Sequence, residues 1–174
     1  MQNWRATNND AERSTGQTGK SVAEQISGSS LTSFAGEQHL RLPGTPDALP
    51  RIRSLVVSVA EAMSFSEEDI GKIEMAVGEA CTNIIEHAYV TQPLREEIDV
   101  VVKQHADRLE ITLLDYSTIN FPIDDNSGVA LDEYIDTQRR RGLGLYIIRT
   151  FVDLVEHRFI CGQGNELRLV KFRA

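Results

Sequence analysis

One long apolar stripe in residues 66–88 constrains the fold more than any other feature of this sequence. Its apolar side chains recur every three or four residues, the period of one face of an α-helix. Ser66 followed by Glu67, Glu68 and Asp69 is typical of a helix start. The sequence therefore predicts a long helix with one buried face. The stripe consists of Ile70, Ile73, Val77, Ala80, Cys81, Ile84, Ile85 and Ala88.

Further helix and strand patterns lie on both sides of this segment. Two more long helices are expected, together with a short one in the polar stretch 116–141. Four or five strands complete the pattern, and this order predicts an α+β fold, a two-layer sandwich of helices on one face of a mixed β-sheet. The expected long helices span 45–62 and 142–155, the short helix 129–135, and the strands 37–42, 97–103, 108–115, 156–161 and 166–172.

Composition separates a tail from a single domain. Residues 1–32 are rich in Asn, Ser, Thr and Gly, and such a segment buries too little apolar surface to offset its ordering entropy. We expect a disordered N-terminal tail over 1–32 and one domain over 33–174. The tail could be a plain solvated extension or a docking or regulatory arm.

The charge of the chain limits its partners. The 174 residues carry a net charge of −8, which argues against a general nucleic-acid binder because phosphates require a basic face. No stretch approaches the roughly 20 apolar residues that span a bilayer. The N-terminus lacks the apolar core of a secretory signal. Cys81 and Cys161 are interpreted as buried thiols, and the protein is expected in the cytoplasm without a membrane.

One face of the long helix carries polar groups. Glu79, Asn83 and Glu86 cluster away from the apolar stripe, and His87 lies at the edge of that face. They could simply form a solvated face with a structural histidine. In a functional interpretation, the Asn83 oxygen suits Mg²⁺. A carboxylate one turn away could orient or deprotonate a nucleophile.

Two further signals point to nucleotide chemistry. Gly142 and Gly144 follow three arginines and open a helix, where unpaired N–H groups attract anions. The alternative is a glycine-rich entry turn with solvated arginines. Asp115 ends a strand and could accept a hydrogen bond from an exocyclic amino group, such as that of adenine. It could equally start a turn.

The order of these signals resembles a known family. Residues 79–89, Glu-Ala-Cys-Thr-Asn-Ile-Ile-Glu-His-Ala-Tyr, resemble the N box of the GHKL ATPases, which have the Bergerat, or histidine-kinase-like ATPase, fold. They are most similar to the bacterial anti-sigma-factor serine kinases. Residues 141–148 resemble the second glycine box of that family, and Gly164 with the last strand resembles its closing segment. The resemblance covers about residues 35–174.

The resemblance implies a role for each matching residue. Glu79 would be the catalytic base and Asn83 the Mg²⁺ ligand. Asp115 would bind adenine, and Arg140 would reach toward the terminal phosphate. The remaining nucleotide-binding positions implied by the match are His87, Gly142, Leu143 and Gly144, with the two glycines facing the phosphates.

The first glycine box departs from the family pattern. The family has Asp-x-Gly-x-Gly, whereas this chain has Ser117 and Ile119 at the glycine positions. If both positions require a positive φ, each would be strained by roughly one to a few kcal/mol. The alternative is a rebuilt loop. Asn165 also replaces the threonine usual in the family.

The resemblance implies an ATP- and Mg²⁺-dependent serine/threonine protein kinase. It would phosphorylate a small anti-sigma-factor antagonist and sequester a sigma factor, with homodimers usual in the family. One alternative is a non-catalytic protein-binding module of the same fold with weak or lost ATP binding. Another is a histidine-kinase-like catalytic domain without its dimerisation helices.

The segment 116–141 is expected to act as a lid over the nucleotide.

Overall fold

Three long helices form one layer of the domain. In this computed structural model, the described residues are 24–26, 29–34, 36–88, 97–118 and 140–174. The short helix η1 (Pro46–Ala48) leads into α1 (Leu49–Ala62), which is followed by α2 (Glu67–Ala88) and α4 (Arg140–Phe151). The Ser66 hydroxyl oxygen accepts a hydrogen bond from the Asp69 backbone N–H at 3.1 Å. This cap confirms the predicted start of α2.

The second layer is one antiparallel sheet. In the described part of the chain, its seven strands run in the order β1-β2-β3-β4-β5-β7-β6, and all of their pairings are antiparallel. The expectation of a mixed sheet with four or five strands was therefore wrong in both respects. The strands are β1 (Glu24–Ile26), β2 (Ser29–Phe34), β3 (Glu37–Pro43), β4 (Glu97–Gln104), β5 (Arg108–Asp115), β6 (Leu154–Ile160) and β7 (Gly164–Phe172).

β1 and the first four residues of β2 fall in the segment 1–32 that was expected as a tail. β2 pairs with β3 from Ser30↔Arg41 to Phe34↔Glu37, so the sheet begins before residue 33. Pairing with β3 satisfies the backbone hydrogen-bonding groups of β2. A composition rich in serine does not by itself predict such a strand. The rest of the expected tail, 1–23, lies outside the described residues.

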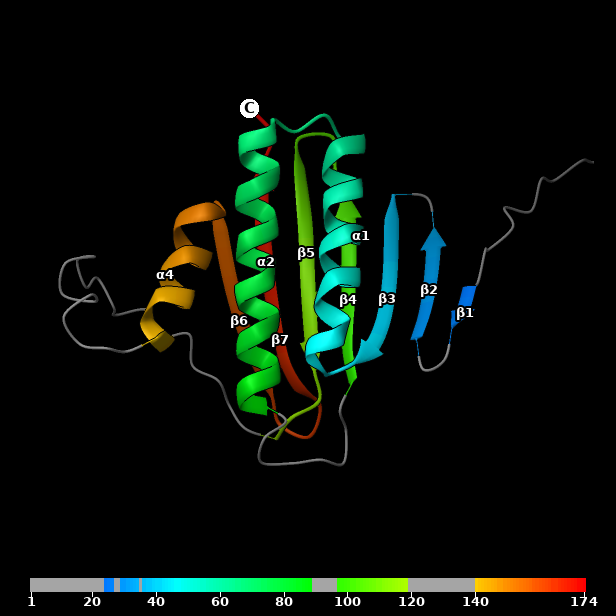
Figure 1. The fold of residues 1–174 in the computed structure, drawn as a ribbon, viewed down its shortest axis with the longest axis vertical. Helices are drawn as coiled ribbons and strands as arrows, with labels where there is room; N and C mark the ends of the chain where they lie inside the picture. Colours follow the sequence, from blue (N-terminus) through cyan, green and yellow to red (C-terminus); the bar gives the residue numbers. More distant parts are fainter. Residues whose placement is uncertain (1–23, 27–28, 35, 89–96, 119–139) are drawn as a thin grey trace, which may run out of the picture.

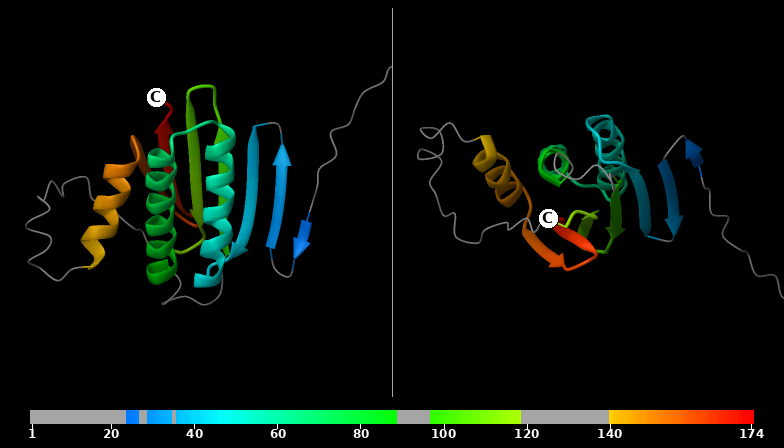
Figure 2. Two further views of the ribbon diagram at one scale, coloured as in Figure 1. Left: turned by 45° about the horizontal axis from the view of Figure 1, so that its top comes forward. Right: turned by 90° about the horizontal axis from the view of Figure 1, so that it is seen from below.

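The helices cover one face of the sheet, and the core lies between the two layers (Figures 1 and 2). The face of the sheet turned to the helices is almost wholly apolar. Each fully buried Ile or Leu stabilises the fold by about 1.5–3 kcal/mol. The stripe of α2 predicted from the sequence supplies the opposite wall. The largest fully buried side chains are Leu42, Ile52, Ile73, Ile98, Leu109, Ile111, Leu113, Ile148, Leu169, Val56, Val59 and Val77.

The topology brings four chain segments to one end of the domain. The C-terminal ends of α2 and β5 lie at the lower end in Figure 1, together with the N-terminal ends of α4 and β7. The predicted site residues lie on these segments. Segments that are far apart in the sequence therefore meet at one end.

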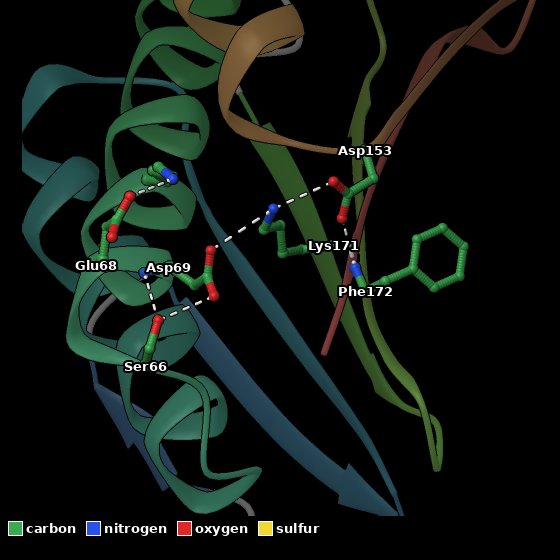
Figure 3. A network of polar contacts seen from close by, with 7 residues as sticks. Ser66, Glu68, Asp69, Asp153, Lys171 and Phe172 are labelled. Atoms are coloured by element: carbon green, nitrogen blue, oxygen red, sulfur yellow. Dashed lines mark hydrogen bonds and ion pairs between the residues drawn. The ribbon is translucent and has the colours of Figure 1, made fainter. Parts of the chain in front are cut away.

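The opposite end is joined by ion pairs (Figure 3). The Lys171 Nζ atom lies 3.1 Å from an Asp153 oxygen and 3.6 Å from an Asp69 oxygen. A second Asp153 oxygen accepts a hydrogen bond from the Phe172 N–H at 2.7 Å. These contacts connect the start of α2, the end of β7 and the segment after α4.

Several local expectations are corrected. The third helix ends at Phe151 rather than at residue 155, because Leu154 already pairs with Val170 in the sheet. Cys81 is buried as expected, but Cys161 is exposed. The expected short helix 129–135 and most of the expected lid lie outside the described residues. Within the described part of the chain, no helix combines the length and the apolar character needed to cross a membrane.

Candidate functional site

Glu79 and Asn83 meet the start of α4 through a glycine. A Cβ atom added to Gly144 would lie 2.9 Å from the Glu79 Oε2 atom. It would lie 3.6 Å from both side-chain polar atoms of Asn83. The absence of a side chain at Gly144 thus lets the α4 backbone approach these two polar groups closely. The structure brings together three of the predicted site residues.

Gly144 is the fifth residue of α4, so the contact with Glu79 and Asn83 lies directly after the first turn of the helix. The helix begins at Arg140, so its first four N–H groups have no partner within the helix. Such groups attract anions, and glycine permits close approach. Gly144 is buried, whereas Leu143 is half exposed, at 50%. The side chains of Arg140 and His87 lie outside the described part, so their roles remain predictions.

Asp115 belongs to a buried polar cluster at the end of β5. Asp115, Ser117 and Asn165 are each only 4% exposed. The Ser117 N–H donates to the Asp115 Oδ1 atom at 2.9 Å. The Asn165 Nδ2 atom donates to the same oxygen at 3.1 Å and to the Ser117 Oγ atom at 3.0 Å. Buried polar groups satisfied in this way hold one orientation.

His157 extends this cluster onto β6. Its Nε2 atom lies 3.0 Å from the Asn165 Oδ1 atom. The residue lies diagonally across the β6–β7 ladder from Asn165, which pairs directly with Phe159. His157 was not singled out from the sequence. Its position in the predicted hairpin was the one available signal.

Gly164 locks β7 against the end of β5. Its φ of +117° lies in a region that side-chain-bearing residues rarely adopt. A Cβ atom there would overlap the Asp115 carbonyl oxygen and lie 2.8 Å from the Tyr116 Cα atom. Asn165, the next residue, pairs with Asp115 in the ladder. The glycine therefore fixes the register that brings Asn165 to Asp115.

Ser117 occupies the position of the first glycine of the family's box with an ordinary backbone conformation. Among the described residues other than glycine, Ser64 alone has a positive φ. Ser117 is therefore unstrained, and its N–H and hydroxyl oxygen both enter the Asp115 cluster. The strain that a required positive φ would impose on a serine is absent, which favours the alternative of a rebuilt loop. Ile119 lies outside the described residues.

The residues present fit a magnesium ion that arrives with a nucleotide. The described residues contain no cluster of three His, Cys, Asp or Glu side chains that could hold a metal alone. Mg²⁺ needs only one or two protein oxygens when phosphates and water complete its shell. The Asn83 oxygen lies near the Gly144 backbone, directly after the first turn of α4. An amide oxygen at this position is therefore a suitable ligand for Mg²⁺ that is bound to phosphates.

Comparison with known proteins agrees with this geometry. The chain is 34% identical over 120 residues to the serine-protein kinase RsbW of Bacillus licheniformis, covering 67% of this chain and 74% of that one. It is 30% identical over 123 residues to RsbW of Bacillus mycoides, with the same coverage.

A solved structure shares the fold. The RsbU and RsbW domains of Rv1364c from Mycobacterium tuberculosis superpose with a TM-score of 0.56 at 17% identity. The match covers 80% of this chain and 33% of that one. The sequence profile of the histidine kinase-like ATPase domain matches residues 42–171. The chain thus belongs to the histidine kinase-like ATPase domain family, with distant homology to the RsbW anti-sigma-factor serine kinases.

Proposed function

We propose that this protein is an ATP-dependent serine/threonine protein kinase of the anti-sigma-factor type. The observation that carries the proposal is the packing of the Gly144 backbone against Glu79 and Asn83. A base, a magnesium ligand and a phosphate-facing helix start are the parts that phosphoryl transfer requires. The relatives named serine-protein kinase RsbW support the same reaction.

The nucleotide would be held at both of its ends. In this proposal, Asp115 accepts a hydrogen bond from the amino group of adenine. The N–H groups at the start of α4 hold the phosphates, with Gly142, Leu143 and Gly144 alongside. Asn83 holds magnesium on the phosphates, and the bound ion neutralises charge that develops on the transferred group. Arg140 and His87 complete the proposed binding set.

Glu79 would act as the base. A substrate serine or threonine hydroxyl attacks the terminal phosphorus of ATP. The new oxygen–phosphorus bond forms as the bond to the ADP oxygen breaks. Glu79 accepts the hydroxyl proton, so ADP leaves with the bonding electron pair. A positioned base of this kind contributes about 10²- to 10⁴-fold in rate.

The proposed partners are proteins. A small anti-sigma-factor antagonist would be the phosphoryl acceptor, and a sigma factor would be the sequestered partner. The net charge of −8 supports protein partners over direct binding of nucleic acid. We place the protein in the cytoplasm, away from membranes, and a homodimer is part of the proposal.

A second candidate is a protein-binding module of the same fold with weak or lost ATP binding. The specific observation in its favour is the serine at position 117, where the family has the first glycine of its box. The two candidates differ in nucleotide turnover.

The test uses Glu79→Gln and a captured substrate. Affinity capture from native cells, with and without Mg-ATP, should recover a small antagonist-type protein. Labelled ATP is then used to measure phosphoryl transfer onto that protein. Glu79→Gln should bind Mg-ATP like the parent but transfer at least about 100-fold more slowly.

The matched control is Glu74→Gln, on the same helix. Its transfer rate should equal that of the parent. Equal rates for Glu79→Gln and the parent would contradict the role of Glu79. A parent that captures the partner but neither binds nor hydrolyses ATP would favour the binding module.

A further inference from the structure

We propose that Asn165 and His157 are positioning residues that hold Asp115 as a hydrogen-bond acceptor. The site thereby selects adenine over a base that carries a carbonyl oxygen in place of the amino group. The inference rests on the proposed function, because it concerns the base of the bound nucleotide. It goes beyond that function by assigning roles to two residues that contact Asp115 directly or through one another.

The hydrogen-bond pattern fixes which way Asn165 points. A side-chain amide has two donor hydrogens on nitrogen and an acceptor oxygen. The Nδ2 atom lies 3.1 Å from the Asp115 Oδ1 atom and 3.0 Å from the Ser117 Oγ atom. A carboxylate accepts only. The nitrogen must therefore face Asp115, and both of its hydrogens are engaged.

The orientation of Asn165 in turn fixes the proton on His157. With its nitrogen facing Asp115, Asn165 presents its Oδ1 atom to the His157 Nε2 atom at 3.0 Å. That oxygen can only accept, so the Nε2 atom of His157 must carry the hydrogen. The three side chains thus form a directed relay from β6 through β7 to the end of β5, in which His157 donates to Asn165 and Asn165 donates to Asp115.

The relay determines what Asp115 offers to a ligand. The Ser117 N–H and the Asn165 amide both donate to Oδ1. These bonds stabilise the carboxylate as an acceptor and leave Oδ2 with acceptor capacity for a base. An amino group donates to such an oxygen, whereas a carbonyl oxygen is repelled by it. A buried polar group left without its partner is costly, so the wrong base is rejected.

A purely structural network would have other consequences. It would stabilise the β5–β7–β6 part of the sheet, and its loss would weaken all nucleotides equally. The relay instead predicts a change in the ratio of affinities for two nucleotides that differ only in the base. Mg-ATP and Mg-ITP are the appropriate probes, because inosine carries an oxygen where adenosine carries the amino group.

The experiment measures dissociation constants of both probes by titration calorimetry on the full chain. The parent should prefer Mg-ATP by at least about tenfold, the effect of one charge-assisted hydrogen bond. Asn165→Asp places a second carboxylate beside Asp115, and two such groups share a proton. The pair then has a donor, so the preference should fall by about tenfold.

Variants of His157 test the far end of the relay. His157→Phe removes the donor and should reduce the preference severalfold. His157→Gln retains an N–H donor and should restore it. His105→Phe is the matched control, because His105 lies at the β4–β5 turn, where its backbone N–H donates to the Arg108 carbonyl oxygen and its ring Nε2 atom lies 3.6 Å from a Glu110 oxygen. It should leave the preference unchanged.

Nitrogen NMR of the parent provides a readout that does not depend on any variant folding. The imidazole of His157 should carry its hydrogen on Nε2. A hydrogen on Nδ1 with none on Nε2 would overturn the relay, as would unchanged preferences in folded Asn165→Asp and His157→Phe. A parent that binds neither nucleotide would overturn the proposed function itself, and the inference with it.

Discussion

The two ends of the domain use polar groups in opposite ways. At the α2 start, Lys171 lies between Asp69 and Asp153, so opposite charges are paired within the protein. At the other end, Asp115 is 4% exposed and receives hydrogen bonds from an amide and a backbone N–H. Among the described side chains, no cation pairs with it.

The difference separates a structural clamp from the proposed binding site. Charges that neutralise one another hold the start of α2, the end of β7 and the segment after α4 together. A carboxylate oxygen held by neutral donors keeps acceptor capacity for a ligand of the proposed site. Two glycines also differ between the ends. A Cβ atom added to Gly144 would lie 2.9 Å from the Glu79 Oε2 atom, whereas one added to Gly71, near the start of α2, would have no atom within 4 Å.

The largest expected effect comes from Gly164→Ala. The new methyl group would overlap the Asp115 carbonyl oxygen, and the φ of +117° adds strain. We expect a loss of about 3 kcal/mol or more in the free energy of unfolding. Urea unfolding measures it.

Gly162→Ala is the matched control for that variant. Its φ is +79°, but nothing lies within 4 Å of the added methyl group. It should cost about 1 kcal/mol. Equal losses for the two variants would show that the close approach of Gly164 to Asp115 contributes nothing.

The next effect separates binding from stability. Gly144→Ala places a methyl group 2.9 Å from the Glu79 Oε2 atom and displaces that side chain. Alanine also favours the helix by about 1 kcal/mol, so stability should change little. Affinity for Mg-ATP or the transfer rate should fall by about 10- to 100-fold, equivalent to roughly 1.4–2.8 kcal/mol.

Gly71→Ala provides the comparison on α2. It should raise the free energy of unfolding by up to about 1 kcal/mol and leave Mg-ATP affinity unchanged. If Gly144→Ala behaved in the same way, the close contact between α4 and Glu79 would have no functional role.

A moderate effect is expected at the clamp. Lys171 is 14% exposed, and Lys171→Met leaves Asp69 and Asp153 without their shared cation. We expect a loss of about 1–2 kcal/mol in unfolding free energy, less than for a fully buried pair. Mg-ATP affinity should not change.

Lys72→Met is the control for the clamp. Its pair with Glu68, at 2.6 Å, lies on the exposed surface of one helix. Such a pair contributes about 0.3–0.5 kcal/mol. If Lys171→Met lowered the unfolding free energy no more than this control, the network in Figure 3 would stabilise the fold no more than an exposed ion pair does.

The smallest effect concerns pH and Asp99. Burial would raise the pKa of Asp99, but hydrogen bonds from Arg41 and Tyr116 outweigh it and lower the pKa below its ordinary value. The carboxylate therefore stabilises the fold above about pH 4, and this contribution is lost as the pH falls through the folded-state pKa. Because Arg41 is largely exposed, the contribution should stay below about 1 kcal/mol.

Urea midpoints between pH 7 and pH 3 measure this contribution. Asp99→Asn should lose less stability on acidification than the parent. Asp107→Asn, at an exposed pair with Arg108, should follow the parent curve. Parallel curves for Asp99→Asn and the parent would contradict the assignment.

Much of the fold follows from local patterns. The stripe of α2, its Ser66 cap and the β6–β7 hairpin were all predicted, because each depends on residues close in sequence. The end of α4 was wrong because Val152 and Val155 fit a helical period as well as a strand. β2 was missed because its pairing with β3, rather than its serine-rich composition, holds it in the sheet.

In the candidate site, too, the features set by local motifs were predicted and those set by distant pairing were not. Glu79, Asn83 and Gly144 were identified from motifs, and their contact is now seen. The relay was not predicted, because Asn165 and Asp115 are 50 residues apart and meet through the register of β5 and β7. For position 117 the sequence left two alternatives open, strain or a rebuilt loop, since it does not show that the N–H of Ser117 has a partner in Asp115.

The most direct test compares two aspartates at the two ends by calorimetric titration with Mg-ATP. Asp115→Asn should stay folded and lose at least about tenfold in affinity, because it removes the charged acceptor. Asp153→Asn should be less stable but bind like the parent. Parent-like affinity in Asp115→Asn would contradict the assignment of this end of the domain as the nucleotide site.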